Sequence, residues 1–513
     1  MSSTKKIRSA LVSVYHKDHL EPIITKLHND GVRLISTGGT RSFIEGLGYP
    51  CTAVEDLTGY PSILGGRVKT LHPKIFGGIL ARRDNESDNK ESAQYEIDPI
   101  DLVIVDLYPF EETVASGASE ADIIEKIDIG GISLIRAAAK NFADVAIVAS
   151  KAQYPILAGI LDARGAETTL EDRRLLAREA FAVSSGYDTA IYNWFAGTTK
   201  LEDSPLSALR VAVDGAMPLR YGENPHQSAS YFGNFDALFD KIHGKEISYN
   251  NLLDIDAACS LIDEFEDTTV AILKHNNACG CATRGTVAEA WAAALAGDPV
   301  SAFGGIIICN RKIEAEAAAE INKIFFEVVI APEFSDDALA ILTQKKNRII
   351  LRRKSAAPVC SKMRTILGGM LVQDNDSKVE TREDMKLVAG DTLSDSTVAD
   401  MIFANILVKH SKSNAIVLAR NGQLLASGVG QTSRVDALRH AIEKAHSFGF
   451  DLKGATMASD AFFPFADCVE IAHKEGVDNV IQPGGSIRDT DSVEYCRNNG
   501  MTMVMTGFRH FRH

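Results

Sequence analysis

The chain has 513 residues, of which 45% are hydrophobic and 24% are charged, the composition of an ordinary globular protein. This length predicts about three domains. A formal net charge of −14 argues against a general binder of nucleic acids or membrane surfaces. Anionic ligands must therefore be held by local basic pockets.

The cysteines and the apolar segments indicate the compartment. Eight cysteines are scattered along the chain rather than grouped in a dense framework, which suits a reducing cytosol. Cys279 and Cys281 form a lone C-x-C without a second pair at zinc spacing, so we expect no metal there. The N-terminal apolar run is too short for a signal peptide, and no run approaches transmembrane length. The sequence predicts a cytoplasmic protein without a membrane partner.

The first part of the chain alternates apolar runs with amphipathic helical patterns. The runs at 10–14, 32–35, 102–105 and 145–148 are predicted strands. This alternation predicts a doubly wound α/β domain with its ligand loops at the carboxyl ends of the strands. The second run leads into a Ser-Thr-Gly-Gly-Thr turn and a helix, where backbone N–H groups and the helix dipole favour an anion. A plain strand-to-helix turn is the alternative interpretation.

Segment 59–74 is rich in glycine and proline and gathers basic side chains in an acidic chain: Arg67, Lys69, His72 and Lys74. Such a loop serves a ligand or forms a solvated surface. Together with the turn at 106–110 and the segments 127–131 and 136–141, it resembles the inosine monophosphate (IMP) cyclohydrolase domain of a bifunctional purine biosynthesis family. The resemblance implies a methylglyoxal-synthase-like fold.

The same resemblance implies residue roles in closing a formamido ribotide to IMP. Lys69 and Tyr108 would polarise the formyl oxygen, while Asp128 and Lys140 would handle protons. A straight helix would hold Asp128 and Lys140 about 18 Å apart. Either the Gly-Gly break after Ile129 folds the segment back, or a subunit interface supplies one of the pair. The implied phosphate and ribose contacts are Lys17, Thr37, Gly38, Gly39, Thr40 and Arg67.

Several positions depart from the family pattern. Tyr15 and His16 stand where relatives commonly carry Ser-Asp, which puts the local ribotide contacts in doubt. Asp106 replaces a usual asparagine, so that an amide donor has become an acceptor. Phe76 stands for a frequent histidine, and Ala278 for a usual proline. We expect both activities of the family to survive these changes.

Segment 196–205 is predicted to link two domains, 1–200 and 201–513. Beyond it, Arg220 offers a fork for phosphate and Tyr221 a stacking face. Lys274 and His275 follow the apolar run 270–272, which predicts a buried strand ending in a polar turn. The cation favours a neutral, proton-accepting imidazole. The alternative is a strand end capped by solvated basic residues.

A Lys-His pair recurs at 409–410, and Ser-x-Ala-Phe-like turns occur at 301–303 and 459–462. This order predicts a duplicated α/β subdomain, roughly 211–370 and 371–513, with the strand-end loops of both copies facing a shared cleft. Aromatic turns in such a cleft suit a flat ligand such as a pterin.

Together these motifs resemble the aminoimidazole carboxamide ribonucleotide (AICAR) formyltransferase domain of the same family, which implies cytidine-deaminase-like subdomains. His275 would be the base or proton shuttle, and Lys274 would stabilise the oxyanion or protonate the folate nitrogen. Asn414 would be a catalytic residue close to the reacting groups. The implied substrate contacts are Arg220, Tyr221 and Arg509, and the implied folate and base contacts are Phe303, Phe462 and Phe463.

The sequence therefore predicts a bifunctional enzyme. It would transfer a formyl group from 10-formyltetrahydrofolate to AICAR and close formyl-AICAR to IMP, as a one-carbon transferase and a hydrolase acting on cyclic amidines. The resemblance implies a homodimer and allows a structural potassium ion, without a catalytic metal. One alternative is that the N-terminal domain only senses nucleotides. A zinc nucleobase deaminase is a second alternative, although the H-x-E…P-C-x-x-C signature is absent.

Overall fold

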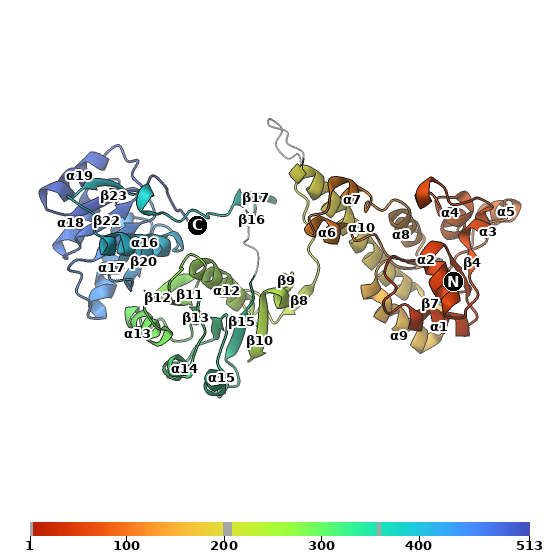
Figure 1. The fold of residues 1–513 in the computed structure, drawn as a ribbon, viewed down its shortest axis with the longest axis horizontal. Coiled ribbons are helices and arrows are strands. Elements are labelled where there is room, and N and C mark those ends of the chain that lie inside the picture. The colour runs from red at the N-terminus through yellow and green to blue at the C-terminus, as the bar shows by residue number, and fades with distance from the viewer. Residues whose placement is uncertain (1–3, 199–207, 356–360) are drawn as a thin grey trace. The chain divides into compact units, whose positions relative to one another are not determined.

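The computed structural model describes residues 4–198, 208–355 and 361–513. The chain divides into two compact units, Met1–Val213 and Asp214–His513 (Figure 1). Residues 199–205 of the predicted linker lie outside the described residues. Within those residues, no helix is long and apolar enough to cross a membrane.

Unit 1 is built on a five-stranded sheet in the order β4-β3-β2-β5-β6, and all neighbouring strands are parallel. The strands are β2 (Ser9–Ser13), β3 (Arg33–Ser36), β4 (Thr52–Ala53), β5 (Leu102–Val105) and β6 (Ala146–Val148). Strands β3 and β4 lie on one side of β2, and β5 and β6 lie on the other. This reversal places a topological switch point at the carboxyl ends of β2 and β5. The predicted doubly wound domain is confirmed.

Helices cover both faces of this sheet, because alternate side chains of its strands point to opposite sides. One core contains Val12 and Ile104 with α1 (Glu21–Asn29), α2 (Gly38–Gly46) and α9 (Tyr154–Arg164). The other contains Leu11 and Val103 with α3 (Val54–Thr58), α4 (Pro73–Leu80), α8 (Gly130–Lys140) and α10 (Leu170–Thr198). The remaining elements are β1 (Thr4–Lys6), β7 (Glu167–Thr169), η1 (Leu64–Gly66), α5 (Glu86–Gln94), α6 (Phe110–Ala115), α7 (Glu120–Ile124) and η2 (Lys151–Gln153).

Unit 2 contains two six-stranded sheets with the same topology, β10-β15-β14-β13-β11-β12 and β18-β23-β22-β21-β19-β20. The first consists of β10 (Phe239–His243), β11 (Thr269–Lys274), β12 (Asn277–Thr283), β13 (Ile306–Cys309), β14 (Val328–Ala331) and β15 (Ile349–Arg353). The second consists of β18 (Lys386–Ala389), β19 (Ile416–Ala419), β20 (Leu424–Gly428), β21 (Thr456–Ser459), β22 (Asn479–Gln482) and β23 (Thr502–Met505). The orders correspond strand for strand, so the predicted duplication is confirmed.

The two copies share one core. It contains side chains from both sheets and from α12 (Tyr249–Ile262) and α16 (Asp395–Lys409). The edges of the copies also meet, because Thr283 N–H donates to Gly422 O at 2.8 Å. The outer helices are α13 (Val287–Gly297), α14 (Ala315–Ile321), α15 (Asp336–Leu342), α17 (Arg434–Ser447), α18 (Asp467–Lys474) and α19 (Asp489–Asn498). Smaller elements are β8 (Ala216–Leu219), β9 (Ala229–Phe232), α11 (Phe235–Leu238), β16 (Ser361–Ile366), β17 (Gly369–Asp374) and η3 (Arg382–Asp384).

The motifs that suggested the duplication are not equivalent in the two copies, and this part of the prediction is wrong. Lys274 ends strand β11, whereas Lys409 ends helix α16, the counterpart of α12. Likewise, Ser301 precedes β13, whereas Ser459 ends the equivalent strand β21. The run before Lys409 is apolar because α16 is buried on all sides there, and a short apolar run does not distinguish such a helix from a strand.

Candidate active sites

The switch point of unit 1 is closed by Asp106, which follows β5. Its carboxylate accepts the backbone N–H groups of Tyr15 and His16, the latter at 2.9 Å, and lies 3.3 Å from His16 Nδ1. Asp106 therefore joins the loops after β2 and β5. Both oxygens of Asp106 accept hydrogen bonds from the Tyr15–His16 loop. The carboxylate at this position, where the family pattern predicts an asparagine, therefore binds the protein's own backbone.

Tyr108 lies beside this joint. Its ring packs edge-on against Tyr15 with 5.6 Å between centroids, and Lys126 Nζ lies 5.7 Å from the Tyr108 ring and 5.5 Å from the Tyr15 ring. Burial, the charge of Asp128 and Tyr15 all raise the pKa of Tyr108. The phenol is therefore a hydrogen-bond donor at neutral pH. The sequence analysis missed Lys126, because no motif distinguishes one lysine in a short helix-to-helix connection.

Asp128 lies just before α8, and its Oδ1 accepts the Gly131 N–H at 2.5 Å. A Cβ added to Gly131 would come within 2.7 Å of Asp128 Oδ2, so this approach requires glycine. Burial raises the pKa of Asp128, while hydrogen bonds from the backbone of Gly131, Tyr108 and Ile132 oppose the rise. A carboxyl group with a raised pKa beside a phenol is suited to proton transfer.

Lys69 reaches the start of α2. A Cβ added to Gly38 would lie 3.9 Å from Lys69 Nζ, and one added to Gly66 would lie 2.9 Å from Lys69 Cε. Gly38 and Gly66 have φ of 53° and 91°, so both backbone positions favour glycine. The ammonium group and the N-terminus of α2 together make this a cationic corner of unit 1.

The other predicted phosphate contacts are already engaged within unit 1. Thr40 Oγ1 donates to Val14 O at 2.9 Å, and Thr37 Oγ1 donates to Glu55 at 3.0 Å. Lys17 Nζ donates to Val14 O and Tyr15 O, both at 2.8 Å, and Arg67 pairs with Glu125. Gly39 lies in the first turn of α2. Of this predicted set, Lys17 lies at the Tyr15 loop, and Gly38 adjoins Lys69.

Lys140 does not join Asp128 within one chain. Helix α8 runs without interruption from Gly130 to Lys140, which is exposed at the far end, about 15 Å along the axis. The Gly-Gly sequence starts the helix instead of folding the segment back. Of the two predicted ways to bring these residues together, only a subunit interface is left.

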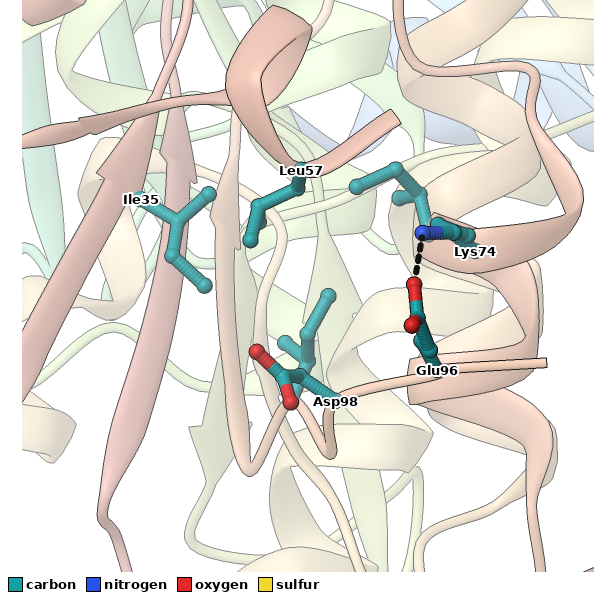
Figure 2. Close-up of a pocket in the computed structure, with 7 residues that line it drawn as sticks. Ile35, Leu57, Lys74, Glu96 and Asp98 are labelled. Carbon is teal, nitrogen blue, oxygen red and sulfur yellow. Dashed lines mark hydrogen bonds and ion pairs between the residues drawn. The ribbon is translucent and has the colours of Figure 1, made fainter. Parts of the chain in front are cut away.

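Lys74 from the basic loop contacts acidic residues. Figure 2 shows it in a small pocket lined by Ile35, Leu57, Ile75, Glu96, Asp98 and Ile100. Its Nζ lies 3.5 Å from Glu96 Oε2. With two carboxylates and a cation that is already paired, this pocket is not an anion site.

In unit 2, His275 and Asn276 form a two-residue turn between β11 and β12, in which Lys274 pairs with Asn277. Both turn residues are left-handed, with φ of 52° and 64°, as a type I′ hairpin requires. Lys274 Nζ donates to Phe303 O at 2.9 Å. The predicted strand end is confirmed, with Lys274 at the end of β11 and His275 in the turn that follows.

The second copy brings Asn414 to the same region. Lys412 N–H donates to Asn277 Oδ1 at 2.9 Å, which ties the loop before β19 to the hairpin of the first copy. Asn414 Oδ1 accepts from Arg434 Nη2 at 3.0 Å, and the same nitrogen donates to Asp460 at 2.6 Å. Arg434 was missed, because nothing in the local sequence distinguishes a nearly buried arginine at the start of a helix.

The three predicted folate-contacting phenylalanines have different environments. Phe303 is 60% exposed and packs against Phe325 with 5.3 Å between centroids, and Phe462 is 37% exposed. Phe463 is fully buried in the core of the second copy, so in this structure its ring packs inside the protein and is not open to a ligand.

The predicted phosphate-binding arginines are exposed. The Cζ of Arg220, which follows β8, lies 5.6 Å from the Tyr221 ring centroid, and Arg509 Cζ lies 4.5 Å from that of Phe511. The residue after Arg509 is buried and fixed, because His510 contacts Asp376 and Glu380, each at 2.7 Å. These contacts anchor the C-terminal segment. The guanidinium group of Arg509 lies exposed next to this anchor.

Comparison with known proteins explains this arrangement. Residues 138–444 match the family described as AICARFT/IMPCHase bienzyme, and residues 19–133 match the MGS-like domain. The chain belongs to the AICARFT/IMPCHase bienzyme family. Membership makes it a bifunctional AICAR formyltransferase and IMP cyclohydrolase, which catalyses the last two steps of IMP synthesis.

Its similarity to relatives spans the whole chain. The bifunctional purine biosynthesis protein PurH of Bacteroides thetaiotaomicron is 66% identical over 513 residues and covers 100% of both chains. The protein of the same name from Rhodospirillum rubrum is 47% identical over 523 residues, covering 99% of each. A crystal structure of ForH, at 34% identity, covers 37% of this chain and 97% of its own, with a TM-score of 0.33 that supports no argument about the fold. The alternative of an N-terminal domain that only senses nucleotides gains no support.

Proposed function

We propose that the two units carry the two family activities separately, with formyl transfer at the Lys274–His275 turn and ring closure at the Tyr108–Asp128 centre. The observation that carries this proposal is that each unit has its own cluster of proton-handling and cationic side chains. Each cluster lies where strands end, the usual position of active sites in α/β proteins.

Formyl transfer requires help because the amine of AICAR is a poor nucleophile. Attack on 10-formyltetrahydrofolate needs proton removal and stabilisation of the formyl oxygen. His275 acts as the base or proton shuttle, and Lys274, which already donates to Phe303 O, supplies the positive charge. Asn414, held by Arg434, lies in the loop bound to this hairpin. We assign the remaining contacts to Arg220, Tyr221 and Arg509 for the ribotide, and to Phe303 and Phe462 for the folate.

Ring closure is intramolecular, so positioning supplies much of the rate acceleration. The carboxamide nitrogen attacks the formyl carbon, and the formyl oxygen leaves as water. Tyr108, whose raised pKa keeps it protonated, donates a hydrogen bond to that oxygen together with Lys69. Asp128 transfers protons, and a raised pKa brings it closer to neutral pH. Lys17 and the start of α2 hold the phosphate.

We further propose that the protein acts as a cytoplasmic homodimer. The free cysteines among the described residues suit a reducing compartment. A partner chain would also offer a route by which Lys140, remote from Asp128 along α8, contributes to ring closure. A structural potassium ion, which the family resemblance allows, plays no part in the proposed chemistry.

The decisive experiment compares Lys274→Ala with Lys69→Ala in the full chain. Tetrahydrofolate release measures formyl transfer, and conversion of supplied formyl-AICAR measures ring closure. Lys274→Ala should lower formyl transfer by at least about 100-fold and spare ring closure, and Lys69→Ala should do the reverse. Normal formyl transfer by Lys274→Ala would contradict the central assignment.

A further inference from the structure

The turn that carries His275 adopts a backbone conformation that its residues do not favour. His275 and Asn276 both have left-handed φ, 52° and 64°. Asparagine and histidine enter this region more often than most residues with a Cβ, but it is uncommon even for them. The surroundings must therefore hold the turn. Because the imidazole direction depends on this backbone, whatever fixes the turn also aims His275.

One carboxylate contacts the turn from α12, in addition to Asn277 Nδ2, which donates to His275 O at 2.8 Å. Asp254 Oδ1, in the first half of α12, accepts the Asn276 N–H at 2.6 Å. With its amide nitrogen facing α12, the Asn276 side chain also donates to Leu253 O and to Asp254 Oδ1, each at 3.0 Å. Helix α12 starts with a capping box between Ser248 and Asn251, so Asp254 projects from a well-defined helix.

The same carboxylate acts on His275 electrostatically. Asp254 is half-buried, and burial raises its pKa while the Asn276 N–H and the neighbouring His275 lower it. The charged residues adjoining this turn also include Lys274, which precedes it on β11, and Lys412, whose N–H donates to Asn277. Among these neighbours, Asp254 is the residue with a negative charge that acts on His275.

We propose that Asp254 is a positioning residue for formyl transfer: its carboxylate fixes the His275–Asn276 turn and thereby aims the imidazole. This inference rests on the proposed role of His275. Asp254 need not touch either substrate. It acts through the backbone N–H of Asn276 and through its charge, and these two effects can be separated by substitution.

Two variants separate the effects. Asp254→Ala removes both the acceptor and the charge, and should lower kcat for formyl transfer at least about 10-fold, with KM for AICAR changed less than about twofold. Asp254→Asn keeps an oxygen that accepts the Asn276 N–H but removes the charge. It should retain more of kcat, and the acidic limb of its kcat/KM profile should move by at least about 0.5 unit, because the substitution removes a negative charge close to His275.

The controls use the full chain. Asp256→Asn removes an exposed carboxylate two positions along α12 and should leave kcat and the pH profile unchanged. Ring closure of formyl-AICAR by each variant reports the integrity of unit 1. Thermal denaturation reports whether a loss of activity reflects a loss of folded protein.

The His275→Ala variant distinguishes a failure of the proposed role of His275 from a failure of the positioning role of Asp254. If it transfers formyl groups at the normal rate, the proposed role of His275 fails. If it is inactive while Asp254→Ala has the kcat and pH profile of the unaltered protein, the positioning role alone is overturned. A loss in both Asp254 variants that follows the folded fraction, with the acidic limb unmoved, would also overturn it.

Discussion

The buried His510 makes the stability of unit 2 depend on pH in the alkaline range. Its side chain is 3% exposed, with Nδ1 and Nε2 each 2.7 Å from a carboxylate oxygen, of Asp376 and Glu380 respectively. Burial alone would lower the pKa of this imidazole, but the two carboxylates reverse the effect and raise the pKa to about 9. Both ring nitrogens therefore donate at neutral pH.

The sign and size of the effect follow from this shift. A group whose pKa is higher in the folded than in the unfolded state stabilises the fold fully below its unfolded pKa. The contribution is then lost as pH rises through the folded value. Each pKa unit corresponds to about 1.4 kcal/mol, so a rise from 6.5 to about 9 corresponds to about 3 kcal/mol. We expect the free energy of unfolding of unit 2 to fall by this amount between pH 6.5 and 9.

Tryptophan fluorescence can isolate this unit. The chain has two tryptophans, and Trp291 is buried in unit 2 whereas Trp194 lies in unit 1. In a Trp194→Phe background, urea denaturation followed by fluorescence therefore reports unit 2. His510→Gln in the same background should remove most of the pH dependence between pH 6.5 and 9. Equal slopes of free energy against pH with and without His510 would refute the reasoning.

Two further predictions concern the predicted folate contacts Phe463 and Phe303 and the predicted ring-closure residues Lys140 and Asp128. Phe463→Ala should destabilise unit 2 by about 3–5 kcal/mol in urea denaturation, as expected for a core phenylalanine. Phe303→Ala should change stability by less than about 0.5 kcal/mol but raise KM for 10-formyltetrahydrofolate, and the opposite pattern would reverse the two assignments. If Lys140 acts across a subunit interface, Lys140→Ala and Asp128→Ala variants, each inactive in ring closure, should regain activity when dissociated and reassociated together. Activity that stays at the level of the separate variants would exclude this role.

Periodicity was sufficient for the architecture. The apolar runs of unit 1 become parallel strands buried on both faces, and their short length and separation by helical patterns already indicated a doubly wound sheet. A polar turn after β11 was also predictable from Asn276 and Asn277, although the turn itself consists of His275 and Asn276, and Asn277 already begins β12. Its left-handed geometry now explains why Lys274 and His275 occur at a strand end.

The second Lys-His pair shows where local reasoning fails. Lys409 and His410 both contact Glu264 of the first copy, at 2.8 and 2.9 Å, and Lys409 also donates to Lys378 O. These partners are remote in sequence, so nothing near the pair indicates that its charge is buried at the junction of the two copies. The pair resembles the Lys274–His275 turn only in its amino-acid sequence. In the fold it is a paired, buried end of α16, and burial lowers the pKa of His410.

The departures from the family pattern at Tyr15, His16 and Asp106 can also be interpreted only from contacts between residues that are remote in sequence. In the sequence, Tyr15, His16 and Asp106 each looked like a lost ligand contact. In the structure they contact one another, because both backbone N–H groups of the first pair donate to the carboxylate of the third. An asparagine side chain has one oxygen where Asp106 has two, so it could not accept both N–H groups through separate oxygens. These contacts leave Tyr108 in place, with its ring packed against Tyr15. Because the proposed ring-closure residues Tyr108, Asp128 and Lys69 are all present, we expect the activity to persist with these departures.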